Sequence, residues 1–324
     1  MDWLMEIEMA ITLFFQQLGN WLEIPFQAFT FLGNELFFLL VMPAIYWSIN
    51  PQIGFRSGMM LVLSGGLNSC FKLLFHSPRP FWVDARVDAM SSETSFGLPS
   101  GHAQNSAAIW GIIAASMRKK WAMIVAVIVV CFIGLSRIYL GVHFVRDVLS
   151  GWLIGALLVV LYLKLEKPAT LWLAARSFSV QLLLSFIFSI ILILLGYICQ
   201  AVSIGWELPS SWINQAVASG AEAPNPFSLE GVITIAGVAF GFTAGYAWWR
   251  KKFGNPEIKA TALKRLARYI IGLLGILALY AGLKVIFPQD PVLIESIFRF
   301  IRYALIGLWV TALAPLLFKK LNLE

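Results

Sequence analysis

Charged residues are scarce in this sequence: only 13% of its 324 residues are Asp, Glu, Lys or Arg, whereas 59% are hydrophobic. A soluble domain carries about 25% charged and about 45–50% apolar residues, so this composition excludes an ordinary soluble protein. The apolar residues form long runs that are almost free of charge, such as residues 121–135 and 180–199. Runs of about 18 or more such residues predict helices that span a membrane.

Cysteine and processing signals are also sparse. The three cysteines, Cys70, Cys131 and Cys199, all lie inside apolar runs. An odd number of dispersed cysteines indicates neither a disulfide framework nor a zinc site, so we interpret them as small core residues. Residues 1–10 lack the basic start of a secretory signal, and no cleavage is expected. The net charge of +7 fits the basic loops of a membrane protein, so nucleic acid is not an expected partner.

The apolar runs predict an all-α fold, a polytopic transmembrane helical bundle with about nine spans. Residues 3–20 are expected to form an amphipathic helix that lies on the membrane surface. The expected spans cover residues 26–48, 54–75, 102–117, 121–139, 144–164, 179–200, 229–249, 266–286 and 298–318.

Basic residues indicate the orientation of these spans. Most of the 24 Lys and Arg residues fall on the side that holds the C-terminus, which the positive-inside rule makes cytoplasmic. The N-terminus is then extracytoplasmic. A basic connector, residues 164–176, divides residues 1–164 from a C-terminal extension of four helices, residues 165–324, within one membrane domain. Glycines spaced for close helix packing lie in the seventh expected span: Gly231, Gly237, Gly241 and Gly245.

Three short segments stand out against this apolar background. They begin at Lys72 (Lys-Leu-Leu-Phe-His-Ser-Pro-Arg-Pro), at Pro99 (Pro-Ser-Gly-His) and at Ser136 (Ser-Arg-Ile-Tyr-Leu-Gly-Val-His-Phe-Val-Arg-Asp). The expected span order places all three at the same, extracytoplasmic face. Because that order depends only on the apolar runs and loop charges, the convergence is evidence independent of the segments themselves.

The residue types in these segments suit a phosphoryl group. Lys72, Arg79 and Arg137 supply three cations, and arginine pairs with phosphate oxygens through two parallel hydrogen bonds. Ser100 and Gly101 open an expected helix, where backbone N–H groups and the helix dipole favour an anion. Together these groups would stabilise the charge that develops during phosphoryl transfer.

All three histidines of the chain fall in these segments: His76 in the first, His102 in the second and His143 in the third. His143 and Asp147 are four residues apart, so in a helix they share one face, and the carboxylate would orient the imidazole as a nucleophile. His102 is the candidate acid that protonates the leaving group and then activates water. No cluster of acidic residues or histidines suits a metal ion, and no metal or cofactor is expected.

The three segments match the pattern of the type 2 phosphatidic acid phosphatase superfamily at every defined position: Lys-x6-Arg-Pro, Pro-Ser-Gly-His and Ser-Arg-x5-His-x3-Asp. The chain resembles this family over residues 72–147, and the helical core of the family would cover roughly 26–164, within a phosphatase core of residues 1–164. The resemblance implies a metal-independent phosphatase in which His143 becomes a phosphohistidine, Asp147 orients it and His102 is general acid and base. It also implies a set of phosphate-binding residues: Lys72, Arg79, Ser100, Gly101 and Arg137.

The substrate is less well defined. A site at the membrane surface favours a lipid phosphate or diphosphate, such as phosphatidate, phosphatidylglycerol phosphate, a sphingoid-base phosphate or a polyprenyl pyrophosphate. The nine-span layout also resembles the glucose-6-phosphatase branch, so a sugar phosphate is the alternative. A third hypothesis is a non-catalytic lipid transporter or scramblase on the same fold, although that change would usually remove motif residues that are intact here. We expect a bacterial inner membrane, with the site facing outward.

Several other residues are interpreted as structural. Asp84, Asp88 and Glu93 lie in the loop before the Pro-Ser-Gly-His segment and are expected to be solvated charges. Trp82 and Tyr139 are expected to be aromatic residues at the membrane interface.

Overall fold

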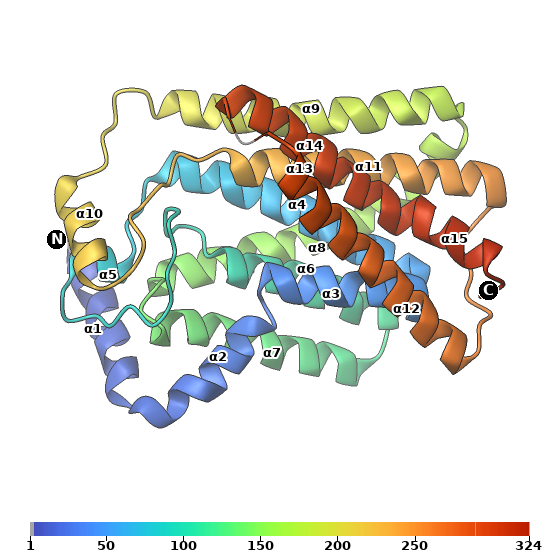
Figure 1. The fold of residues 1–324 in the computed structure, drawn as a ribbon. Helices are drawn as coiled ribbons and strands as arrows, with labels where there is room; N and C mark the ends of the chain where they lie inside the picture. The colour runs from blue at the N-terminus through green and yellow to red at the C-terminus, as the bar shows by residue number, and fades with distance from the viewer. Residues whose placement is uncertain (1–2, 289, 324) are drawn as a thin grey trace. The chain divides into compact units, whose positions relative to one another are not determined.

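The computed structural model describes residues 3–288 and 290–323, and within these ranges it contains helices and loops without any strand (Figure 1). The 3₁₀ turn Asn20–Leu22 precedes α2, and π-helical turns continue α3, α12 and α14. In chain order the α-helices are α1 (Trp3–Gln17), α2 (Glu23–Phe31), α3 (Glu35–Ala44), α4 (Pro51–Phe75), α5 (Pro80–Val83), α6 (Gly101–Met117), α7 (Lys120–Tyr139), α8 (Val145–Ala174), α9 (Phe178–Val202), α10 (Ser210–Ala218), α11 (Glu230–Phe253), α12 (Ala262–Leu277), α13 (Leu283–Ile286), α14 (Val292–Leu308) and α15 (Ala314–Lys320).

Seven helical stretches among the described residues are long and apolar enough to cross a membrane. The count becomes eight if the bent pair Asn20–Phe31 and Glu35–Ile49, which meet at 49°, forms one span. The expected count of nine was too high because α6, the expected third span, has only 17 residues. Such a helix is about 26 Å long, shorter than the ~30 Å hydrocarbon core of a bilayer.

The N-terminal helix α1 has one buried face and one exposed face. Met9 and Thr12 are buried against the rest of the fold, and α1 contacts α7. The opposite face exposes Trp3, Ile7 and Phe14. This two-sided pattern is what an interfacial helix requires, and its position on a membrane stays a prediction.

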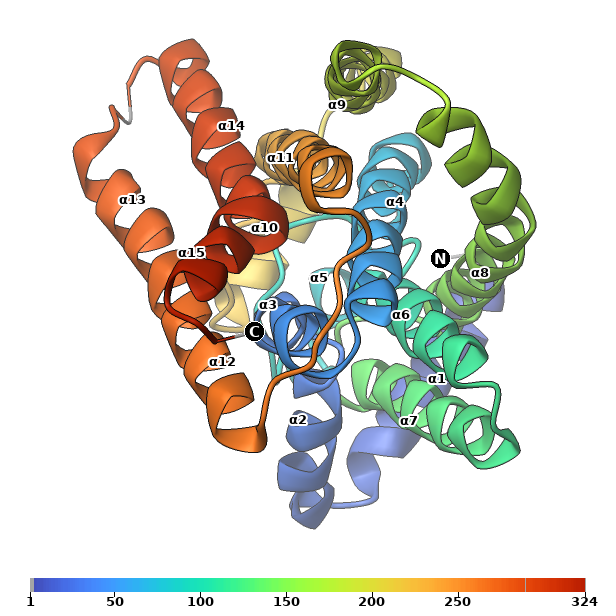
Figure 2. The ribbon, with the colours of Figure 1, turned by 90° about the vertical axis from the view of Figure 1, so that its right-hand side faces the viewer.

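The helices group into two compact units, and the first contains all three motif segments. It comprises Met1–Phe38, Leu67–Val160 and Gly196–Ser228. Within it α7 packs against both α2 and α6, and α10 packs against α5 (Figures 1 and 2).

Aromatic residues dominate the core of this first unit. Trp82 and Tyr139, expected at the membrane interface, are instead fully buried in a cluster with Phe81, Phe96 and Phe144. Their prediction was wrong because an aromatic residue near a helix end has the same local sequence whether lipid or protein covers it.

The second unit comprises Leu39–Gly66, Leu161–Leu195 and Leu229–Glu324. Its main packing is between α11 and α14, which lie side by side (Figure 2). A Cβ on Gly237 would lie 2.6 Å from the carbonyl oxygen of Phe300, and one on Gly241 would overlap the carbonyl of Ala304. The expected role in close helix packing is therefore confirmed for Gly237, Gly241 and Gly245, whereas Gly231 is exposed.

Candidate active site

The first motif segment lies at the end of α4 and in the turn to α5. Lys72 is in the last turn of α4, and its Nζ donates a hydrogen bond to Ser95 Oγ at 2.8 Å. The helix ends before His76, which takes a φ of 47°, and α5 begins at Pro80. A residue before proline is restricted to extended conformations, so Arg79 leaves the helical path, and its side chain is fully buried.

The guanidinium of Arg79 is held by backbone carbonyls. Nε donates to Ser95 O at 2.7 Å, Nη1 donates to Val142 O at 2.9 Å, and Nη2 donates to Phe96 O at 3.2 Å. Nη1 also lies 3.1 Å from Nε2 of His143. With five N–H donors in a rigid plane, the side chain is fixed in orientation by these partners and by Ser95 Oγ, which accepts from Nη2 at 3.1 Å.

The second segment forms the N-terminus of α6. Ser100 is the N-cap residue, and its Oγ accepts a backbone N–H of the first turn at 3.4 Å. Its own N–H donates to the carbonyl oxygen of Asp147 at 2.9 Å, which ties this turn to the third segment. Asn68 Nδ2 donates to Pro99 O at 3.1 Å, and a Cβ on Gly101 would lie 3.1 Å from Asn68 Oδ1. Glycine therefore permits a tight approach between α4 and α6 here.

The third segment places His143 between an arginine and a carboxylate. Its Nε2 lies 3.1 Å from Arg79 Nη1, and its Nδ1 lies 3.3 Å from Asp147 Oδ2. Arginine only donates hydrogen bonds, so Nε2 must accept, and the ring proton must be on Nδ1, facing Asp147. Asp147 Oδ2 also accepts the backbone N–H of Phe144 at 3.0 Å, which fixes the carboxylate.

Arg137 and Glu93 complete the charged centre. Arg137 is buried, and its Nη1 donates to Thr30 Oγ1 at 2.6 Å. Glu93 pairs through Oε1 with Nη2 of Arg137 and through Oε2 with Nη2 of Arg79, the latter at 3.5 Å. The prediction of a solvated charge at Glu93 was wrong, because both arginines bind it.

The electrostatics of the centre follow from this arrangement. Burial alone would raise the pKa of Glu93, but Arg79 and Arg137 hold it well below its usual range. Burial and the nearby cations of Arg79, Arg137 and Lys72 lower the pKa of His143 well below its ordinary value. The imidazole is therefore neutral near pH 7, with its Nε2 lone pair available.

His102 occupies the first turn of α6. A Cβ on Gly33 would lie 3.5 Å from its Cδ2, so the start of α6 lies beside the break between α2 and α3. The charges of Arg137, Glu93 and Lys72 all act on its ring.

The structure brings the three motif segments into one cluster. Lys72 and Arg79 share Ser95, both arginines share Glu93, Arg79 contacts His143, and Ser100 bonds to Asp147. This arrangement presents a neutral imidazole nitrogen next to three cations.

Comparison with known proteins identifies the family. Residues 54–171 match the model of the PAP2 superfamily, and residues 233–324 match that of the PAP2 superfamily phosphatase transmembrane extension. Phosphatidylglycerophosphatase B of Bacillus subtilis (strain 168) is 32% identical over 154 residues, which cover 44% of this chain and 73% of that protein. The chain belongs to the PAP2 superfamily. It is thus an integral membrane protein with multiple spans and a phosphatase of the phosphomonoesterase class.

Other PAP2 proteins match over shorter parts of their length. Human glucose-6-phosphatase 3 is 32% identical over 163 residues, which cover 43% of this chain and 47% of that protein. Rat sphingosine-1-phosphate phosphatase 1 is 31% identical over 139 residues, 41% of this chain and 32% of that protein. The chain therefore matches less than half of the length of these two relatives. A crystal structure titled as the first transmembrane PAP2 type phosphatidylglycerolphosphate phosphatase from Bacillus subtilis has 28% sequence identity and a TM-score of 0.45, covering 50% of this chain and 86% of that one.

Several residues that contact the PAP2 motifs were missed from sequence. Glu8 of α1 accepts the backbone N–H of Arg146 at 2.7 Å and so caps the N-terminus of α8, directly before Asp147. Ser95 and Glu93 lie in a short run of small polar residues, Ser-Ser-Glu-Thr-Ser, within an otherwise apolar chain. This run of polar residues is the sequence feature that could have pointed to Ser95 and Glu93, because polar residues are scarce in the rest of the chain.

The segment that follows α9 also reaches this site. The indole of Trp206 stacks on the His76 ring at 4.7 Å between centroids, and Ser203 Oγ lies 2.7 Å from His76 Nε2. The backbone N–H of Asn225 donates to Thr94 O at 2.9 Å. Part of the C-terminal half of the chain therefore supports the loop that carries Glu93.

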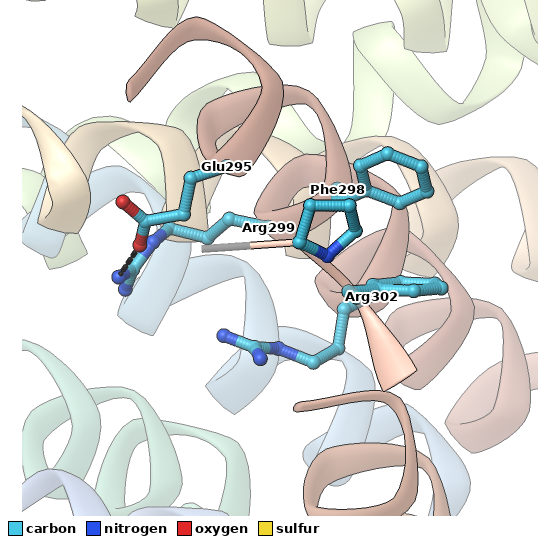
Figure 3. Close-up of a pocket in the computed structure, with 6 residues that line it drawn as sticks. Glu295, Phe298, Arg299 and Arg302 are labelled. Atoms are coloured by element: carbon cyan, nitrogen blue, oxygen red, sulfur yellow. Dashed lines mark hydrogen bonds and ion pairs between the residues drawn. The ribbon is translucent and has the colours of Figure 1, made fainter. Parts of the chain in front are cut away.

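A second cluster of basic residues lies in the other unit and is structural in this conformation. Arg299 pairs with Glu295 at 2.7 Å (Figure 3). Arg299 also pairs with Glu230, and Arg302 lies over the rings of Tyr280 and Tyr303. The pocket beside them has about 10 Å³ of space, roughly that of one water molecule.

Proposed function

We propose that this PAP2 phosphatase hydrolyses a lipid phosphate or diphosphate through a phosphohistidine at His143. The observation that carries this proposal is the fixed tautomer of His143. Its Nδ1 faces Asp147 at 3.3 Å, and its Nε2 lone pair faces the guanidinium of Arg79 at 3.1 Å. Because Nε2 of His143 faces the Arg79 guanidinium, a phosphate bound by that guanidinium would lie next to the attacking nitrogen.

Binding uses the cations and the start of α6. Lys72, Arg79 and Arg137 would contact the phosphoryl oxygens, with Arg79 and Arg137 as forks and Lys72 as a point charge. Ser100 and the free N–H groups at Gly101 would donate to the remaining oxygen at the positive end of the helix dipole.

The reaction then proceeds in two displacements. Nε2 of His143 attacks phosphorus as the bond to the leaving oxygen breaks, and His102 supplies a proton to that oxygen. The Asp147 carboxylate stabilises the positive charge of the phosphorylated imidazole. His102 next removes a proton from water, the water oxygen bonds to phosphorus, and the P–N bond breaks to release inorganic phosphate and free His143. Protein cations supply the charge neutralisation, so the proposed reaction is metal-independent.

A lipid substrate is supported by the membrane spans and by relatives named as phosphatidylglycerophosphatase and sphingosine-1-phosphate phosphatase. Phosphatidate, phosphatidylglycerol phosphate, a sphingoid-base phosphate and a polyprenyl pyrophosphate are the candidates. We place the site on the extracytoplasmic side of a bacterial inner membrane, with the C-terminus cytoplasmic. The similarity to glucose-6-phosphatase 3 favours a sugar phosphate as the second candidate.

The test is phosphate release by detergent-purified protein in the presence of a chelator, across the four lipids and glucose 6-phosphate. We expect release from a lipid that is abolished in His143→Ala. Preference for glucose 6-phosphate would replace the lipid proposal with the second candidate. If no phosphoester is cleaved and the protein moves lipid between leaflets, the proposal fails in favour of a scramblase.

A further inference from the structure

The carboxylate of Glu93 occupies the position that a substrate phosphate needs. Its two oxygens bind Nη2 of Arg137 and Nη2 of Arg79, the two forks assigned above to phosphate. The side chains of these arginines are 2% and 0% exposed, whereas that of Glu93 is 23% exposed. Of these three charged side chains, only that of Glu93 is therefore exposed enough to rotate out of the site.

The other contacts of the two arginines do not have to change when Glu93 leaves. Arg79 keeps the carbonyls of Ser95, Phe96 and Val142 and the hydroxyl of Ser95, and Arg137 keeps Thr30 Oγ1. The forks would stay in place, with the Nη2 group of each facing the space that the Glu93 carboxylate leaves. Two carboxylate oxygens are thus exchanged for two phosphate oxygens without rebuilding the site.

Both neighbours of Glu93 are bonded to residues that follow α10. The N–H of Glu222 donates to the side-chain Oγ of Ser92 at 3.0 Å, and the N–H of Asn225 donates to the backbone oxygen of Thr94 at 2.9 Å. Movement of Glu93 is therefore a rotation of its side chain rather than a rearrangement of the loop. Such rotations are fast compared with typical turnover.

We infer that Glu93 is a resident anion that the substrate phosphate displaces and that returns when product phosphate leaves. In the empty site it neutralises buried guanidinium charge, which would otherwise be costly. In the loaded site its negative charge lies beside a phosphate and weakens phosphate binding. Glu93 thereby lowers the affinity of the site for inorganic phosphate, the product of every substrate considered, and this inference depends on the proposed phosphate-binding role of Arg79 and Arg137.

The experiment compares the parent with Glu93→Gln, which keeps the size of the side chain and removes its charge. Binding of inorganic phosphate is measured by calorimetry in detergent, and inhibition by inorganic phosphate and orthovanadate is measured during turnover. We expect phosphate to bind about tenfold more tightly to the variant, equivalent to ~1.4 kcal/mol. Asp88→Asn is the matched control, because it removes an exposed charge from the same loop, and it should leave phosphate binding unchanged.

Glu93→Asp is the second variant, for the case in which Glu93→Gln does not fold. Its shorter side chain cannot reach both arginines well, so phosphate affinity should rise by a smaller factor. Unchanged or weaker phosphate binding in a folded variant would overturn the inference, since it would make Glu93 an orienting group for the arginines. The binding assay needs no turnover, so a parent that binds phosphate but cleaves nothing would refute the proposed function and leave this comparison valid.

Discussion

Replacing Asp147 by asparagine removes the negative charge beside His143 with a change of one atom. Asp147 Oδ2 accepts the backbone N–H of Phe144 at 3.0 Å and faces His143 Nδ1 at 3.3 Å. Both contacts use the same oxygen, so the amide oxygen of the variant, placed there, would keep both hydrogen bonds and the proton on Nδ1. What the variant loses is the charge of the carboxylate.

The cost follows from the charge that forms on His143. When Nε2 attacks phosphorus the imidazole becomes positively charged, and in the variant no carboxylate at Nδ1 stabilises that charge. Removing one preorganised electrostatic partner of a developing charge lowers kcat by about 10²–10³-fold, and we expect an effect of this size for Asp147→Asn. The backbone hydrogen bond from Ser100 N to Asp147 O does not involve the side chain and is kept in the variant. The free energy of unfolding should therefore fall by only about 1–2 kcal/mol.

The assay is phosphate release in chelator, with thermal unfolding and phosphate binding measured on the same preparation. Asp88→Asn, an exposed residue, is the control for the same chemical change outside the site. A folded Asp147→Asn protein that binds phosphate and retains kcat within about tenfold of the parent would refute the claim that His143 needs the Asp147 carboxylate.

Four further predictions address packing and pH. A Cβ on Gly97 would lie 2.9 Å from Asp147 Oδ2, so Gly97→Ala should destabilise the fold by about 1–3 kcal/mol and reduce kcat, as thermal unfolding and turnover would show. Gly241→Ala should destabilise the α11–α14 contact by a similar amount with little effect on kcat, while Gly282→Ala, which faces open space, should be neutral in thermal unfolding. The lowered pKa of His143 means that its NMR signals should not titrate between pH 8 and 6; a midpoint at about 6.5 would contradict this. Because only the unfolded chain would bind that proton, the contribution of His143 to stability should be lost as the pH falls below about 6.5.

The convergence of the motif segments was predictable from sequence for physical reasons. The structure pairs His143 with Asp147 as expected, but His143 lies before α8, so the pair is formed by the turn into that helix and not by a shared helical face. Pro80 begins α5 with Arg79 extended before it, and Ser100 begins α6 as its N-cap. Each of these depends on local chemistry. The catalytic and binding roles of these residues stay predictions until variants are assayed.

Contacts between distant parts of the chain were beyond the sequence. The position of Glu93 depends on Arg137, 44 residues away, and on bonds from Glu222 and Asn225, more than 120 residues away. A carboxylate in a loop has the same local sequence whether it is solvated or paired. The ends of α6 agree with the expected residues 102–117 to within one residue, but its assignment as a span failed for a related reason, since an apolar helix of 17 residues is buried by protein as readily as by lipid.

Part of the chain between the two family-model matches supports the motif segments. Ser203 Oγ donates to Leu73 O at 2.9 Å and contacts His76, which anchors the end of α9 to the turn between Lys72 and Arg79. The following loop then bonds to both neighbours of Glu93, at the side chain of Ser92 and at the backbone of Thr94. Relatives that match similar shares of this chain carry different substrates in their names, so membership of the family alone does not select a substrate. Residues 203–228, which contact the site without belonging to any motif, are where we expect the substrate preference of this chain to be determined.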